Sequence, residues 1–447
     1  MNKKNHLIEG SIVKKIITLT IPMIFAMLST VVFNLVDTFY VSRLGTQELA
    51  AIGFTFPVIM IVQSVALGFG VATSSVVSRA IGRSDYHKVK RLATDSLIIS
   101  LLIVIFFVAL GFLSMDWMFR LLGAKGNTLY LIKEYMRVWY AGVIFVVIPM
   151  VGNNAIRACG NMFIPSLVMI SSAFVNIVLD PLFIFGLWGF PRLELKGAAI
   201  ATVISRSVAM VCSLLVLHYK EKLIDFTIPP LKEALESVKE ILYIGVPSAA
   251  SRLLVPISMA VVMRLVSVFG ATAVAAFGVA VKIEMLVFTV IMALASALIP
   301  IVGQNWGARN IFRVRESLKI SNEFSLLWGF ISFVFLGVLA IFLGNIFGKD
   351  TEVARNITFY LWILPISYGL RGCAFLAPSV FNAMNKPLVA IKLNFIRVFV
   401  FYLPLAMIGS WISGLVGLFL GLCLANLCAG IFSIFIGRKF LRNFEFI

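Results

Sequence analysis

The stretch Val31–Gly45 reads Val-Val-Phe-Asn-Leu-Val-Asp-Thr-Phe-Tyr-Val-Ser-Arg-Leu-Gly, and it decides the fold class of this chain. It ends an apolar run that begins near residue 16, which is long enough to cross a bilayer because about 20 apolar residues suffice. Asp37 lies within that run. A charged side chain at the centre of a bilayer costs roughly 2.5–3.5 kcal/mol on insertion scales, so we expect the rest of the chain to supply partners for Asp37.

The composition of the whole chain is that of a membrane protein. Of its 447 residues, 61% are hydrophobic and only 13% are charged, and the mean hydropathy is +1.02. Soluble domains carry about 25% charged residues. The alternating polar and apolar strands of a membrane β-barrel are absent from the sequence, which leaves an all-α polytopic membrane protein.

Apolar runs separated by polar turns predict twelve transmembrane helices. Their expected limits are 16–40, 47–76, 92–114, 129–155, 163–186, 196–218, 240–268, 272–302, 320–343, 358–383, 388–408 and 413–437. Basic residues gather at both termini and in alternate loops, as in Arg79–Arg91, Lys220–Lys239 and Arg309–Lys319. By the positive-inside rule these loops and both termini are cytoplasmic, so the net charge of +18 reflects membrane topology and not nucleic-acid binding.

A cytoplasmic linker over 219–240 is expected to separate an N-terminal six-helix bundle, 1–218, from a C-terminal six-helix bundle, 241–447. Pro229 and Pro230 are followed by apolar residues at helical spacing, with Lys and Glu between them. This pattern predicts a short amphipathic helix that lies on the inner membrane surface and joins the two halves.

The two bundles are related by an internal repeat. A shift of 225 residues, without a gap, aligns Pro22 with Pro247, Gly45 with Gly270, Ala50-Ala51-Ile52-Gly53 with Ala275-Ala276-Phe277-Gly278, and Gly82 with Gly307. The shift covers six helices, so the repeats have the same orientation and are related by an axis along the membrane normal, as in transporters whose two bundles rock against each other. Asp37 aligns with Val262, so cation chemistry at this depth is expected in the first half only.

The predicted fifth helix carries a second carboxylate. Asn176 and Asp180 are four residues apart and therefore share one face of that helix. Pro181 has no N–H, which leaves the carbonyl of Ile177 without its helical donor. The direction of the helices brings Asp37 and Asp180 to a similar depth in the outer half of the membrane.

Tyr135 and Thr202, on the predicted fourth and sixth helices, are expected at the same depth. Two interpretations of this cluster stay open. In one, Asp37 and Asp180 are structural hydrogen-bond anchors, one of them permanently protonated. In the other, they share a proton or bind a small cation, because two carboxylates in low dielectric take up a proton readily and oxygen ligands suit hard cations. The ligand type does not separate H⁺ from Na⁺.

Further candidates are weaker. Gln63, Asn153 and Asn154, together with Tyr135, are polar residues in apolar spans that could form a hydrogen-bond network to a substrate. Glu284 is the only carboxylate well inside the second-half spans, either as a cavity acid or as half of a structural pair. The sequence shows no nucleophile–base set and no metal-ligand spacing, so we expect neither an enzyme nor a resident cofactor.

Several motifs resemble those of one transporter family. They are Pro22, Asp37 and Gly45 in the first helix, Arg157-Ala-Cys-Gly-Asn161, Asn176-x-x-x-Asp180-Pro181, and Gly197-Ala-Ala-Ile-Ala-Thr202, within twelve spans in two halves. With these features the chain resembles multidrug and toxic compound extrusion (MATE) transporters over nearly its whole length, and more closely their DinF-like branch.

The resemblance implies a V-shaped pair of bundles that exports organic cations or other drugs in exchange for inward Na⁺ or H⁺. By motif, it assigns the cation site of the N-terminal half to Asp37, Asn176, Asp180, Thr202 and the carbonyl of Ala198. We therefore expect a monomeric antiporter in the cytoplasmic membrane of a prokaryote, with amphipathic drugs and the lipid bilayer as its partners.

Three alternative functions fit the sequence less well. A lipid-linked precursor flippase of the same superfamily is expected to have more spans or basic residues lining its cavity. A membrane-embedded enzyme lacks support in the motifs, and a channel is disfavoured by the two-bundle repeat without a pore-loop signature.

Overall fold

The structure is a computed structural model that describes residues 7–347 and 351–442. The regular structure in these ranges is helical. The helices are α1 (Ile12–Ser42), α2 (Thr46–Gly82), α3 (Tyr86–Leu121), α4 (Gly126–Gly142), α5 (Ile144–Ala158), α6 (Phe163–Phe185), α7 (Glu194–Leu215), α8 (Leu231–Ser267), α9 (Ala271–Gly307), α10 (Ile311–Phe347), α11 (Thr351–Ile363), α12 (Tyr368–Ala383), α13 (Pro387–Phe395) and α14 (Leu403–Arg442). Short 3₁₀ or π-helical segments join or extend them, namely η1 (Leu187–Gly189), η2 (Val216–Lys220), η3 (Leu364–Ser367) and η4 (Ile396–Tyr402).

Within the described ranges these helices form twelve membrane-spanning segments, which confirms the predicted number. Ten helical stretches are each long and apolar enough to cross a bilayer, and the pair α4–α5, bent by 42°, adds another. The last of the ten stretches, Pro387–Arg442, has 56 residues and breaks at Ser413–Gly414, where the backbone leaves helical φ/ψ. This break divides it into two spans.

The internal repeat is visible in the helix limits. Helices α2 and α9 both have 37 residues, and their first and last residues, 46 and 82 against 271 and 307, are separated by the predicted 225 positions. The bent stretch 126–158 corresponds in the same way to 351–383. The parallel repeat predicted from the sequence is therefore confirmed.

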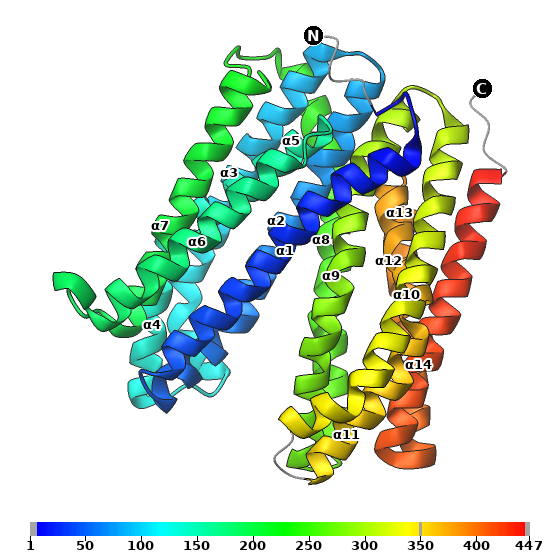
Figure 1. The fold of residues 1–447 in the computed structure, drawn as a ribbon. Coiled ribbons are helices and arrows are strands. Elements are labelled where there is room, and N and C mark those ends of the chain that lie inside the picture. Colours follow the sequence, from blue (N-terminus) through cyan, green and yellow to red (C-terminus); the bar gives the residue numbers. More distant parts are fainter. Residues whose placement is uncertain (1–6, 348–350, 443–447) are drawn as a thin grey trace. The chain divides into compact units, whose positions relative to one another are not determined.

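The chain forms two compact units, each with its own apolar core. The N-terminal unit is Ile21–Ala249, and the C-terminal unit is Ala250–Ile447 together with Met1–Thr20. In each unit the long helices run side by side (Figure 1). The N-terminal core includes the fully buried ring of Phe119, and the C-terminal core that of Phe419. These limits differ from the expected 1–218 and 241–447 because α1 and α8 each contribute residues to both units.

The segment expected as a linker with its own surface helix has a different structure. Residues 223–230 are non-helical, and the helix that begins at Leu231 continues without interruption as α8 to Ser267. The prediction of a separate amphipathic helix is therefore wrong. Most residues of 231–246 are good helix formers. The interior prolines Pro247 and Pro256 do not end the helix, because membrane helices tolerate proline when neighbouring groups satisfy the freed carbonyls.

The segment before α1 and the last turn of α14 are both bonded to the first turns of α10. Arg313 Nη1 donates to the carbonyl of Gly10 at 2.8 Å, and Arg315 Nη2 donates to the carbonyl of Leu441 at 2.6 Å. The start of α1 and the end of α14 thus lie at one end of the C-terminal unit (Figure 1), as an even number of spans requires.

Candidate functional site

The N-terminal unit holds a polar cluster between α6 and α7. Asp180 is fully buried and Asn176 is 1% exposed, one turn earlier on the same helix. In the amide orientation that satisfies both of its ends, Asn176 donates to Asp180 Oδ2 at 2.8 Å and accepts from the backbone N–H of Thr202 at 3.2 Å. In a regular helix the N–H of Thr202 donates to the carbonyl of Ala198, so Asn176 and Ala198 draw on the same donor.

Asp37 joins this cluster from α1. Its side chain is half-buried, and its charge acts on both Asp180 and the buried phenol of Tyr135 on α4. Among the described residues, the Oδ1 atoms of Asp37 and Asp180 are buried and have no hydrogen-bond partner. The structure thus brings together carboxylates from two helices and leaves one oxygen of each available. We name Asp37, Asp180, Asn176, Thr202 and Tyr135 the carboxylate cluster.

Close packing of α6 on α7 fixes the geometry of the carboxylate cluster. A Cβ atom at Gly197 would overlap the backbone of Phe183, so only glycine permits this approach of the two helices. The hydroxyl of Ser172 donates to the carbonyl of Ser205 at 3.0 Å and ties the same helices together deeper in the span. The interior Pro181 removes the N–H that would occupy a carbonyl of α6 one turn before it.

The nearest arginine along α7 does not neutralise the carboxylates. Arg206 lies one turn beyond Thr202, and its guanidinium is placed over the ring of Phe33 on α1, 5.5 Å from the centroid. The carboxylate cluster can therefore accept a proton or a small hard cation on carboxylate and amide oxygens. Among residues 7–347 and 351–442, no three His, Cys, Asp or Glu side chains are grouped closely enough to hold a transition metal.

The other polar residues predicted for the first half lie apart from the carboxylates. Asn154 donates to the carbonyl of Met150 at 2.7 Å, and the Oδ1 atom of the buried Asn153 has no partner among the described residues. Gln63 is half-buried on α2. None of the three has a hydrogen bond to Asp37 or Asp180 in the described part of the chain.

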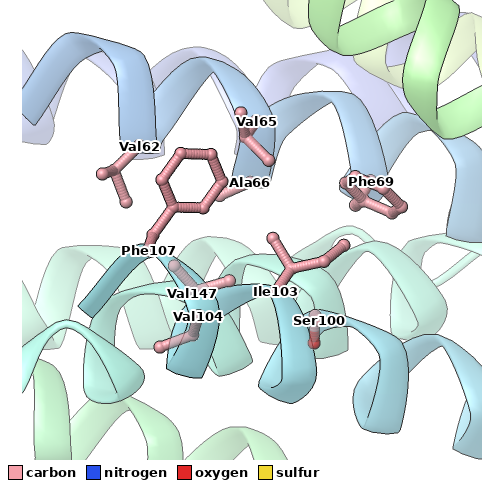
Figure 2. Close-up of a pocket in the computed structure, with 9 residues that line it drawn as sticks. All are labelled: Val62, Val65, Ala66, Phe69, Ser100, Ile103, Val104, Phe107 and Val147. Atoms are coloured by element: carbon pink, nitrogen blue, oxygen red, sulfur yellow. The ribbon is translucent and has the colours of Figure 1, made fainter. Parts of the chain in front are cut away.

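A small apolar cavity lies between α2, α3 and α5 of the same unit. Figure 2 shows that its walls are aliphatic and aromatic side chains such as Val62, Phe69 and Phe107. Its single polar lining residue, Ser100, donates its hydroxyl to the carbonyl of Leu97 at 2.8 Å. None of the predicted site residues lines this cavity.

In the C-terminal unit Glu284 is the centre of a second polar cluster. Its Oε1 atom is 2.5 Å from Arg371 Nη1, and its Oε2 atom accepts from the hydroxyls of Tyr360 and Tyr368 at 2.7 and 3.2 Å. Of the two interpretations of Glu284, the structure shows the paired one. These partners are not among the residues predicted from the sequence, although Arg371 is a charge inside a predicted span and Tyr360 aligns with Tyr135 under the 225-residue shift.

Comparison with known proteins agrees with this architecture. The family model described as MatE matches residues 22–182 and again 247–408, which are two segments separated by the repeat distance. The chain is 34% identical over 439 residues to a protein named FAD transporter from Shewanella oneidensis, covering 98% of this chain and 97% of that protein. It is 24% identical over 436 residues to the multidrug export protein MepA of Staphylococcus haemolyticus, covering 97% and 95%.

Solved structures give the same answer. A crystal structure of the MATE transporter VcmN from Vibrio cholerae, in its bent form, superposes with a TM-score of 0.91 at 30% identity, covering 99% of this chain and 98% of that one. The family match extends over most of the chain, and the relatives and the solved structure are aligned from end to end. The chain therefore belongs to the MATE family of multi-pass membrane transporters.

Proposed function

We propose that this transporter is a secondary antiporter that exports small molecules from the cytoplasm in exchange for inward Na⁺ or H⁺. The observation that carries the proposal is the carboxylate cluster, in which Asp37 and Asp180 each keep a buried oxygen without a partner among the described residues. Carboxylates are expensive inside a membrane and are retained where they bind ions or move protons. The coupling ion is then the only bound group that transport needs, with no other cofactor.

The carboxylate cluster suggests how the cation drives transport. A cation between Asp37 and Asp180 removes the repulsion between two like charges and satisfies their free oxygens. It therefore favours the conformation in which the two carboxylates are close. A substrate that binds more tightly to the other conformation competes with the cation, and this reciprocal linkage couples inward cation flow to export.

Two substrate classes are candidates. Amphipathic organic cations and other drugs are the first, supported by the relationship to a multidrug export protein. Flavin adenine dinucleotide is the second, supported by the higher identity, 34% against 24%, to the protein named FAD transporter. We further propose that the protein is a monomer in the cytoplasmic membrane. Both termini are expected in the cytoplasm, because basic residues concentrate at the termini and in alternate loops.

The proposal is tested by measuring ethidium efflux from cells, or ethidium uptake into inverted vesicles, under separately imposed Na⁺ and H⁺ gradients. We expect one of the two gradients to drive efflux through the wild-type protein. Asp37→Asn keeps the size of the side chain and removes its charge, so gradient-driven efflux should be abolished.

Asp116→Asn is the matched control. Asp116 is an exposed carboxylate of the same unit, paired with Lys133 and Arg120 on the surface, and its loss should leave coupled efflux intact. Full retention of coupled efflux by Asp37→Asn would overturn the assignment of the coupling site.

A further inference from the structure

The polar cluster of the C-terminal unit contains more positive than negative charge. It consists of Glu284 on α9, Tyr360 on α11, Tyr368 and Arg371 on α12, and Arg397 and Tyr402 on η4, and we name it the arginine–tyrosine cluster. The charge of Arg397 acts on Arg371 and Tyr402, and Glu284 acts on Arg371 and on all three tyrosines.

Glu284 already has three hydrogen-bond donors on its two carboxylate oxygens, and its single negative charge can balance only one of the two arginines. One carboxylate oxygen is bound by Arg371 and the other accepts two tyrosine hydroxyls. Among the described residues Arg397 has no carboxylate within ion-pair distance. The cluster therefore carries one excess positive charge inside a membrane-spanning stretch, where an uncompensated arginine is costly and marks a functional site.

Glu284 holds the guanidinium of Arg371 in place, but the side chain of Arg371 remains partly exposed. Glu284 is 8% exposed, whereas the side chain of Arg371 is 25% exposed. Its other N–H groups have no hydrogen-bond partner in the described part of the chain. A buried carboxylate thus orients the guanidinium from one side and leaves donors free on the other, in the fork that suits a phosphate or a carboxylate.

Two aromatic side chains lie beside Arg371, of which Phe288 is buried and Phe375 is half-buried. The guanidinium of Arg371 is over the ring of Phe288, 4.7 Å from its centroid, and Phe288 packs edge-on against Phe375 at 5.3 Å. Arg371 and Phe375 are four residues apart on α12, as are Glu284 and Phe288 on α9, so each pair shares one helix face. Cationic donors beside aromatic faces suit a planar ring that carries an anionic group.

The repeat shows that the excess charge is particular to this half. Under the 225-residue shift Tyr360 aligns with Tyr135, so one phenol occupies the same place in both halves. The carboxylate cluster of the N-terminal unit has two carboxylates, whereas the arginine–tyrosine cluster of the C-terminal unit has two arginines and one carboxylate. Arg371 and Arg397 align with Val146 and Ser172, so the two halves provide sites of opposite charge.

We propose that the arginine–tyrosine cluster binds the anionic group of the exported substrate, a phosphate carried by a planar aromatic compound. Arg371 contacts the phosphate, Arg397 adds positive charge to the site, Phe375 lies against the ring with Phe288 behind it, and Glu284 is a positioning residue that holds Arg371. This inference rests on the proposed export function and favours the second of its two substrate classes. Cation coupling at Asp37 and anion recognition at Arg397 are then separate tasks of the two halves.

The test measures flavin binding to the purified full-length protein in phosphatidylcholine nanodiscs, without any gradient. FAD carries phosphates and riboflavin has the same ring without them, so quenching of flavin fluorescence separates the two contributions. We expect the wild type to bind FAD at least tenfold more tightly than riboflavin. Arg397→Gln should weaken FAD binding at least tenfold and leave riboflavin binding unchanged, and Arg397→Lys, which keeps the charge, should retain most of the affinity.

Arg264→Gln is the matched control, because Arg264 is an exposed arginine of the same unit outside the cluster, and its loss should not change FAD binding. Equal binding of FAD and riboflavin, or unchanged FAD binding in Arg397→Gln, would overturn the inference. Loss of FAD binding when phosphatidylglycerol replaces part of the phosphatidylcholine would overturn it too, since a lipid headgroup would then be the ligand.

The experiments distinguish failure of the proposed cation-coupled export from failure of the proposed anion site. Asp37→Asn should still bind FAD, because it leaves the arginine–tyrosine cluster intact. Intact ethidium efflux together with equal FAD and riboflavin binding removes only the anion site, and FAD binding without gradient-driven efflux of either ethidium or FAD removes only the coupling function.

Discussion

Thr202 contributes to the carboxylate cluster through two different groups. Its backbone N–H holds Asn176, whereas its hydroxyl is a candidate cation ligand. Thr202→Val keeps the shape of the side chain and the backbone bond and removes only the oxygen. We expect cation affinity to fall about tenfold, equivalent to about 1.4 kcal/mol, measured as a smaller rise of the melting temperature on adding Na⁺ or on lowering the pH.

Thr38→Val is the control for this substitution. Thr38 follows Asp37 on α1, is exposed, and donates its hydroxyl to the carbonyl of Asn34 at 2.7 Å. It should leave the cation response unchanged. Equal responses in the wild type and Thr202→Val would show that the hydroxyl is not a ligand.

For single residues, the sequence predicts which side chains share a face of one helix, because helical geometry determines this. Asn176 and Asp180 share a face because they are four residues apart, and the structure places them in hydrogen-bond contact. The partners of Glu284 could not be predicted in this way. Tyr360 and Arg371 come from other helices, and which faces meet depends on the packing of the whole unit.

Between elements, the approach of α10 to α12 depends on glycine. A Cβ atom at Gly329 would overlap the backbone of Gly369, which cannot rotate away. Gly329→Ala should therefore lower the free energy of unfolding by about 1–3 kcal/mol, the range for overpacking a close-packed contact. The measurement is the melting temperature of the purified protein in detergent.

Gly337→Ala is the control within the same helix. A Cβ atom at Gly337 meets nothing within 4 Å, so this variant changes helix propensity without a clash. It should be neutral or slightly stabilising. A loss of stability as large as that of Gly329→Ala would indicate that propensity and not packing determines the effect.

The positions of helix breaks were harder to predict than the helices. The stretch 129–155 was expected as one helix, yet α4 and α5 meet at a 42° bend next to Gly142. A Cβ atom at Gly142 would overlap the side chain of Val203 on α7, so the chain packs closely on α7 beside the bend. The break at Ser413–Gly414 is different, since Gly414 has a φ of 60° that glycine adopts readily.

At the scale of the whole chain, the repeat was the most informative sequence feature. The shift of 225 residues relates the limits of α9 to those of α2, and the stretch 126–158 to 351–383. It also revealed the asymmetry on which both proposals rest, because Asp37 aligns with Val262 and Arg371 with Val146. Two similar scaffolds thus present different charges.

The orientation of this scaffold in the membrane gives the last prediction. The start of α1 and the end of α14 are both bonded to α10 at one end of the C-terminal unit, and by the positive-inside rule we predict that this end faces the cytoplasm. Trp188, 86% exposed between α6 and α7, then faces the outside, and the exposed Lys222 before α8 faces the cytoplasm.

Single cysteines at these two positions test the orientation in a background without the five native cysteines. A membrane-impermeant maleimide added to intact cells should label Trp188→Cys and not Lys222→Cys, and permeabilisation should make Lys222→Cys reactive. Labelling of Lys222→Cys alone in intact cells would reverse the topology. The carboxylate cluster would then lie toward the cytoplasm, and inward cation flow could no longer reach it from the outer half of the membrane.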